Sequence, residues 1–154
     1  MCIRDRYYSI IIMRFSANQQ DIQTSLNYCQ GVIEKRSTLP ILSNILLEAK
    51  NSKLTITATD LDLIFVHVIN NVEVLEEGKT TSSSSIMYDI VRKFSSGSKI
   101  NFSNPSENKL HLESDKSVFN LNCINASEFP LTDENFNENE FSIKSKELLK
   151  LLCR

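Results

Sequence analysis

From Met13 onward, the alternation of apolar and polar residues predicts a short strand that leads into a helix. Residues 13–17 alternate with a period of two, which is typical of a half-buried strand. Asn18 then offers a side-chain oxygen to the first turn of a helix, and Asp21 places a negative charge where the helix dipole favours it. Apolar residues recur at helical spacing along one face, namely Ile22, Leu26, Cys29 and Ile33. Uncharged amides occupy the opposite face, namely Gln20, Gln23, Asn27 and Gln30.

After Pro40 the period changes to two, and β-branched residues become frequent. This pattern predicts three strands, over residues 41–50, 54–59 and 64–74. Asn51 and Ser52 mark a turn between the first two, and residues 76–79 form a polar loop after the third.

The same order of elements is then predicted a second time. A strand at 80–83 precedes a serine run ending at Ser85, which offers a cap for a helix over 86–94. Three strands follow, over residues 100–103, 109–114 and 117–123, with turns at 104–105 and 115–116. In the last strand the residues on one face are apolar, namely Phe119, Leu121 and Cys123. The chain is therefore predicted to be an α+β protein of two βαβββ units, in which the two helices lie side by side.

A third start of this pattern is predicted at the C-terminal end. Phe141 and Ser142 precede Glu147 and Leu148 as Phe15 and Ser16 precede Asp21 and Ile22, at a constant offset of 126 residues (141 minus 15). Residues 132–139 are acidic, rich in Asn and without apolar period, as expected for a linker. We therefore expect one domain over 13–137 and the truncated start of a second over 138–154. Residues 1–12 carry no targeting signal and are expected to be a non-native leader.

Composition excludes several classes of protein. The chain has 154 residues and a net charge of −2, which rules out a strongly basic coat for nucleic acid. No run approaches the roughly 18 apolar residues of a membrane-spanning helix, so no membrane partner is expected. The four cysteines contain no C-x-x-C pair, and with two histidines they give poor support for a zinc site: Cys2, Cys29, Cys123 and Cys153. Free buried thiols are expected, as is a reducing compartment.

Catalytic chemistry has weak support in the sequence. Asp60 and Asp62 could hold a divalent cation in a small metal-dependent enzyme, although no third acidic ligand is indicated. Cys29 or Cys123 could pair with His67 or His111 as a nucleophile, but both cysteines lie on apolar faces. A further alternative is a β-rich interaction module that acts through residues 117–123. No glycine-rich phosphate loop and no G-x-S-x-G motif is present.

Basic residues follow both predicted helices. Lys35 and Arg36 close the first helix, and Arg92 and Lys93 close the second. The helix dipole alone favours cations there. If the two helices lie side by side, however, these residues share a face with the uncharged amides. That face could contact phosphates without binding them tightly.

Three separated motifs resemble a known family. They are Arg-Ser-Thr-Leu-Pro-Ile-Leu-Ser-Asn at 36–44, Thr-Ala-Thr-Asp-Leu-Asp-Leu at 57–63 and Ala-Ser-Glu-Phe-Pro at 126–130. In this order on a βαβββ background, they resemble the first domain of the bacterial DNA polymerase III sliding clamp, its beta subunit. The resemblance runs from Met13 to Arg154, and Met13 corresponds to the initiator of the family.

The resemblance implies a function without catalysis or cofactor. Members of this family have three such domains per subunit, each with two adjacent helices packed on antiparallel sheets. They form a head-to-tail homodimer, a ring whose helices line a central hole and whose sheets form the outer shell. The ring encircles double-stranded DNA independently of its sequence and tethers the replicative polymerase in the cytoplasm. DNA polymerase III and the clamp loader bind the second and third domains, which this chain lacks.

The resemblance also implies two groups of site residues. For DNA binding, Arg36 matches a DNA-contacting arginine and Arg92 a basic family position, while Lys35 and Lys93 are included because they are adjacent. For the subunit interface, an apolar pair on an edge strand and two basic residues match the family: Phe119, Leu121, Lys109 and Lys116. Val118 and Ile86 stand where relatives can carry cations.

Overall fold

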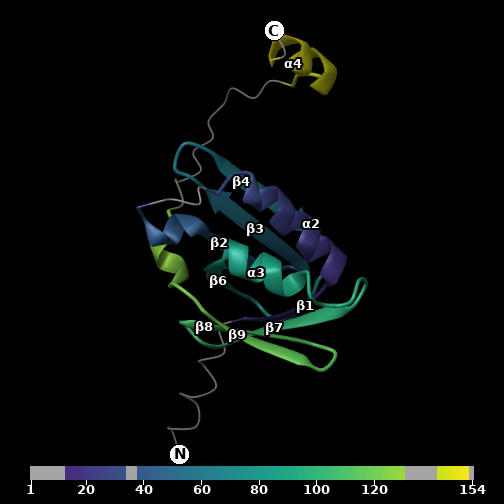
Figure 1. The fold of residues 1–154 in the computed structure, drawn as a ribbon, viewed down its shortest axis with the longest axis vertical. Coiled ribbons are helices and arrows are strands. Elements are labelled where there is room, and N and C mark those ends of the chain that lie inside the picture. The colour runs from purple at the N-terminus through teal and green to yellow at the C-terminus, as the bar shows by residue number, and fades with distance from the viewer. Residues whose placement is uncertain (1–12, 34–37, 131–141, 153–154) are drawn as a thin grey trace, which may run out of the picture.

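Two antiparallel sheets and two neighbouring helices make up the body of the protein in a computed structural model (Figure 1). The structure describes residues 13–33, 38–130 and 142–152. The first unit consists of β1 (Arg14–Asn18), α2 (Gln19–Gln30), β2 (Asn44–Lys50), β3 (Lys53–Thr59) and β4 (Ile64–Ile69). The second consists of β6 (Gly78–Ser83), α3 (Ser84–Val91), β7 (Lys99–Ser106), β8 (Lys109–Ser114) and β9 (Ser117–Asn122). The remaining elements are the short strand β5 (Glu73–Glu76), the 3-10 helices η1 (Pro40–Ser43) and η2 (Ala126–Glu128), and α4 (Ser145–Leu152).

Each βαβββ unit places its first strand in the sheet of the other unit. The strand order is β5-β1-β7-β8-β9 in one sheet and β4-β3-β2-β6 in the other. β1 thus pairs with β7 of the second unit, and β6 pairs with β2 of the first. The two units are related by an approximate two-fold, in which β1, β7, β8 and β9 correspond to β6, β2, β3 and β4. The predicted pair of βαβββ units is therefore correct, and the exchanged strands make the two units one folding domain.

The two helices lie side by side, as predicted, and run antiparallel (Figure 1). Gln19 begins α2, and its Nε2 donates to the carbonyl oxygen of Val91 at the end of α3, at 2.9 Å. At the other end of the pair, Gln30 Nε2 donates to Ser84 Oγ at 3.2 Å. The predicted cap of α2 is also present, because Asn18 Oδ1 accepts from the backbone N–H of Gln20 at 2.9 Å.

The predicted strand over residues 64–74 is in fact two strands in different sheets. β4 ends at Ile69, Asn71 has a left-handed φ of 60°, and β5 then pairs with β1. Asn tolerates this conformation better than most residues, so it can turn the chain from one sheet to the other. The polar loop predicted at 76–79 is shorter than expected, because β5 reaches Glu76 and β6 begins at Gly78.

Three other predicted boundaries also differ. The strand predicted from residue 41 begins at Asn44, because Pro40 starts a 3-10 turn. The helix predicted over 86–94 runs from Ser84 to Val91, and the preceding Ser83 makes no side-chain capping bond. The turn predicted at 104–105 lies inside β7, where the pairing with β8 is irregular between Ser103 and Ser106. Pro105 has no backbone N–H to donate to a neighbouring strand, and proline is tolerated at such a bulge because no ladder hydrogen bond is needed there.

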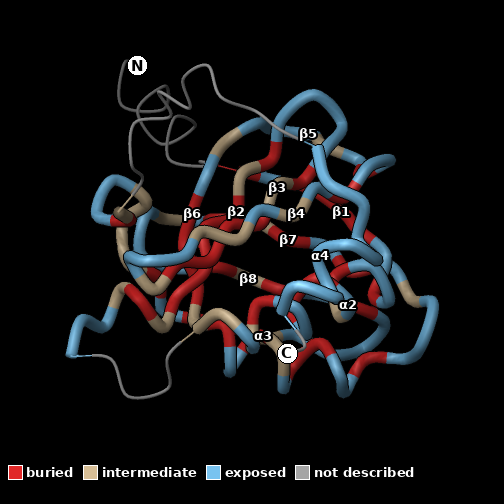
Figure 2. Tube along the Cα trace, turned by 90° about the horizontal axis from the view of Figure 1, so that it is seen from above, coloured by how far each residue is buried: buried red, intermediate tan, exposed pale blue. Residues whose placement is uncertain are grey.

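The core lies where the sheets and the inner faces of the helices meet. Figure 2 shows the buried residues gathered on the central strands and the exposed residues on the turns. The apolar face predicted for α2 is buried at Ile22, Leu26 and Cys29. Phe15 of β1 and Phe102 of β7 are stacked there, with ring centroids 4.6 Å apart. This contact joins the exchanged strand to the sheet that receives it.

Replacing Phe15 with alanine should lower the free energy of unfolding by about 3–5 kcal/mol, because it leaves a cavity opposite Phe102. Urea denaturation followed by circular dichroism measures this change. Leu75→Ala on the neighbouring strand β5 is a matched control, since Leu75 is 66% exposed and its truncation should alter stability by less than about 0.5 kcal/mol. Equal effects of the two substitutions would contradict the proposed role of the stacked pair.

Candidate nucleic-acid and subunit interfaces

The outer face of the helix pair is polar and nearly uncharged. A groove of about 230 Å³ runs between α2 and α3, lined by Gln23, Thr24, Asn27, Tyr28 and Tyr88. These side chains offer amide, hydroxyl and aromatic groups, which can contact a phosphate backbone without a strong Coulomb attraction. The amide face predicted for the first helix is thus present, and the structure adds the two tyrosines, which the sequence analysis did not single out.

Arg92 and Lys93 both lie exposed directly after α3. Arg92 Nη1 is 4.0 Å from Asp89 Oδ1, and its Cζ lies 5.5 Å from the centroid of the Tyr88 ring. Such exposed contacts are weak, about 0–1 kcal/mol each, so the guanidinium can leave them for another partner. The other two predicted DNA-binding residues, Lys35 and Arg36, lie outside the described residues.

The antiparallel course of the helices decides where their C-terminal ends lie. Because Gln19 bonds to Val91, the end of α3 lies beside the start of α2. The end of α2 lies beside Ser84, at the opposite end of the pair. The C-termini of α2 and α3 therefore lie at opposite ends of the shared face and do not form a single cluster.

The four predicted subunit-interface residues all lie on the hairpin of β8 and β9, at an edge of its sheet. Lys116 is exposed in the turn, and Lys109 is exposed at the open end of the hairpin, where it pairs with Asn122. Phe119 and Leu121 point to the inner side of β9, where Leu121 is buried and Phe119 is half-buried.

Phe119 packs against Phe94, a residue that was not predicted from the sequence to contribute to this surface. Its ring meets Phe94 edge-on, with centroids 5.6 Å apart and planes at 81°. Phe94 follows α3, so this contact links the edge strand to the end of the helix that carries Arg92. Local sequence pattern gives no sign of the contact, because the two residues are far apart along the chain.

The predicted pair Asp60 and Asp62 lies in the turn between β3 and β4. Asp60 Oδ1 accepts from the backbone N–H of Asp62 at 3.0 Å and of Leu63 at 2.6 Å. This carboxylate therefore shapes the turn. Within the described ranges, no group of three or more His, Cys, Asp or Glu residues could hold a metal ion.

The candidate thiol nucleophiles are held in their neutral form. Burial raises the pKa of Cys29 from 9.0 to about 12, and burial also raises the pKa of Cys123. The histidines have other partners: His67 Nδ1 donates to Ser25 Oγ at 2.7 Å, since that hydroxyl already donates to the Asp21 carbonyl. His111 Nδ1 donates to Asn120 Oδ1, also at 2.7 Å.

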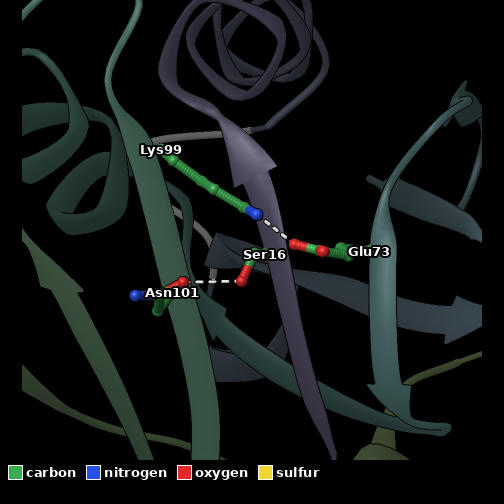
Figure 3. A network of polar contacts seen from close by, with 4 residues as sticks. All are labelled: Ser16, Glu73, Lys99 and Asn101. Carbon is green, nitrogen blue, oxygen red and sulfur yellow. Dashed lines mark hydrogen bonds and ion pairs between the residues drawn. The ribbon is translucent and has the colours of Figure 1, made fainter.

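A pocket of about 530 Å³ lies beside β1, and its lining includes Glu73 of β5 and Lys99 of β7. Lys99 and Glu73 form an ion pair across β1, and Ser16 Oγ donates to Asn101 Oδ1 at 2.6 Å (Figure 3). These contacts connect three neighbouring strands of one sheet. They were not foreseen from the sequence, because only the exchange of β1 brings their strands together.

Comparison with known proteins gives the family. The sequence profile described as DNA polymerase III beta subunit, N-terminal domain, matches residues 13–133. The chain belongs to this family. The beta sliding clamp of Escherichia coli (strain K12) is 31% identical over 140 residues, and that of Caulobacter vibrioides (strain NA1000 / CB15N) is 30% identical over 141. In each comparison the match covers 91% of this chain and 38% of the relative, so the chain spans about two fifths of the length of the family's full clamps.

Solved structures of the family confirm the predicted fold. The DNA polymerase III subunit beta of Pseudomonas aeruginosa aligns with a TM-score of 0.85 at 30% identity, over 92% of this chain and 38% of that one. The Caulobacter crescentus beta sliding clamp aligns with a TM-score of 0.84 at 30% identity, over 91% and 37%. The expected α+β clamp fold and the expected family are both correct. In the described part of the chain, no helix is long and apolar enough to cross a membrane.

Proposed function

We propose that this chain supplies the N-terminal domain of a sliding clamp, a ring-shaped homodimer that encircles double-stranded DNA and tethers the replicative polymerase. The observation that carries this proposal is the polar face of the paired helices α2 and α3, on a body that aligns with solved clamps. Uncharged amides and tyrosines, with few cations, suit a ring that must slide. The function needs no catalysis, and it belongs in the cytoplasm, where bacterial DNA is replicated.

The charges of the helix face support mobile contact. Among the described residues of α2, α3 and the two positions after α3, Asp21 and Asp89 balance Arg92 and Lys93. A face with few cations neutralises few phosphates, so counterion release and the salt-dependent affinity for DNA stay small. Retention then depends on closure of the ring, and local contacts with Arg36, Lys35, Arg92 and Lys93 guide the duplex.

The proposed domain limits are 13–137 for the first clamp domain and 138–154 for the start of the second, with 1–12 as a leader. One structural observation supports the repeat: α4 begins at Ser145, which is 126 residues after the start of α2 at Gln19 (145 minus 19). Every residue of α4 in the described range is exposed, including its four leucines. An amphipathic helix of eight residues needs a partner for its apolar face.

We assign the subunit contact to the edge strand β9 and its hairpin, through Phe119, Leu121, Lys109 and Lys116. The open edge of β9 can extend the sheet into the next subunit by backbone hydrogen bonds. Phe119 stays half-exposed beside that edge, so it can also pack against the neighbour. DNA polymerase III and the clamp loader would bind domains beyond this chain.

A chimera tests the proposed function directly. Residues 13–133 of this chain should replace the matching segment of the Escherichia coli beta sliding clamp without loss of ring closure. After loading onto a nicked DNA circle, the chimera should stay bound during gel filtration, and it should leave when a restriction enzyme linearises the circle. The unaltered clamp is the control. Equal retention on circular and linear DNA would contradict topological binding.

Arg92→Ala in this chimera should weaken binding to DNA several-fold for every sequence and reduce the slope of log affinity against log salt by about 1. The reason is the loss of one phosphate contact from the helix face. Fluorescence anisotropy across a salt series measures both effects. Arg14→Ala, which removes an exposed arginine from the sheet, is the matched control and should leave the slope unchanged. An unchanged slope for Arg92→Ala would remove this residue from the DNA contact.

Phe119→Ala should weaken the dimer of the chimera, because it removes the half-exposed ring at the edge of the sheet. Analytical ultracentrifugation measures the dissociation constant, and circular dichroism checks that the fold survives the loss of the contact with Phe94. Leu75→Ala, an exposed apolar residue on β5, provides the control. A dimer as stable as the parent would show that Phe119 only supports the core of its own domain.

A further inference from the structure

Two residues of α3 hold the side chain of Arg92, and they do so through different contacts. Arg92 Nη1 lies 4.0 Å from the Oδ1 of Asp89, which is three residues earlier and so on the same side of the helix. Arg92 Cζ lies over the ring of Tyr88, 5.5 Å from its centroid. The side chains of Asp89 and Arg92 are both more than half exposed, so the guanidinium can also reach a partner outside the protein.

The two contacts differ in how they affect the binding of a phosphate. The N–H donors of a guanidinium lie at the edge of its plane, and phosphates and carboxylates are both bound through these donors. Asp89 approaches one of the edge nitrogens, so it occupies a position that a phosphate also needs. The contact with the Tyr88 ring uses none of the N–H donors. Asp89 therefore competes with phosphate for Arg92, whereas Tyr88 can hold the side chain in both situations.

Helix stability does not explain why residue 89 is acidic. Asp89 lies in the last turn of α3, which ends at Val91. The dipole of a helix disfavours a negative charge at this end. The exposed ion pair with Arg92 offsets this cost only weakly, because solvent screens it. The carboxylate thus has little effect on the fold, and its main contact is with the cation that we assign to DNA.

We propose that Asp89 limits the DNA contact of Arg92 by competing with phosphate for its N–H donors. While the carboxylate holds the guanidinium, Arg92 is not available to the duplex. Once a phosphate has replaced the carboxylate, the negative charge of Asp89 remains within one helical turn and repels that phosphate. Both effects shorten the contact, which suits a ring that slides. This inference rests on the proposed function, and it adds that an acidic residue of the helix face sets the affinity for DNA.

Nuclear magnetic resonance titration of the whole isotope-labelled chain with a short DNA duplex tests the proposal, because the method measures weak binding without a closed ring. Asp89→Asn removes the charge and keeps the size of the side chain. The affinity of this variant should rise about three- to fivefold, with a steeper slope of log affinity against log salt, since Arg92 is then bound to phosphate for more of the time. Asp89→Glu, which keeps a carboxylate, should bind as the wild type does.

A double variant shows whether Asp89 acts through Arg92. When Arg92→Ala is also present, Asp89→Asn should no longer strengthen binding, because no guanidinium remains to be released. Glu113→Gln is the matched control for the change in net charge. Glu113 is exposed on β8, on the opposite side of the strand from the buried Leu112, and its substitution should leave the affinity unchanged. A purely structural role of Asp89 would alter the unfolding temperature and leave the salt slope as it is.

Three results would overturn the proposal. One is an unchanged affinity in Asp89→Asn, and another is an equal gain in the presence of Arg92→Ala, which would show that Asp89 acts only through the overall charge. The third is a helix face whose signals do not respond to the duplex in any variant, which would remove Arg92 from the DNA contact. Retention of the chimera on circular DNA depends on closure of the ring, so this proposal can fail while the proposed function stands.

Discussion

The exchange of first strands between the two βαβββ units is the constraint from which the other features of the structure follow. β1 leaves its own unit to pair with β7, and β6 pairs with β2. Each sheet is then completed only when both units are folded, so the domain has one shared core. The Phe15–Phe102 stack joins the exchanged strand to its new sheet. A polar contact performs a similar role between the sheets, where buried Asn104 of β7 donates through Nδ2 to Thr80 Oγ1 of β6 at 3.1 Å.

The same arrangement of strands also determines the surfaces to which we assign a function. It brings α2 and α3 together as an antiparallel pair, and glutamine side chains connect them at both ends. Their amide nitrogens are used on the neighbouring helix, so the remaining amides and the two tyrosines form the face that we assign to DNA. It also places β4 and β9 at equivalent edges of the two described sheets.

Prediction from sequence succeeded where the cause is local and failed where it is distant. Asn18 caps α2 because its side chain reaches an N–H two residues away, and the apolar period of the helix reports its buried face. In contrast, residues 64–74 have one continuous β pattern, yet Asn71 turns the chain into the other sheet. The alternation of side chains is the same in both sheets, so the pattern could not show which sheet the segment joins. The exposed position of Arg92 was predictable, whereas the support of Phe119 by Phe94 was not.

The sequence by itself determined the order of strands and helices, the buried face of α2 and, through three motifs, the family. The order of elements and the buried face of α2 depend on residues that are close in sequence. The family follows from the likeness of the three motifs to those of the sliding clamps. Only the tertiary structure decided which strands are exchanged, that the helices are antiparallel, and that β4 and β9 lie at equivalent edges of the two sheets. Those features arise from contacts between segments that are distant in the chain, and a linear pattern of apolar and polar residues contains no information about which distant segment each one meets.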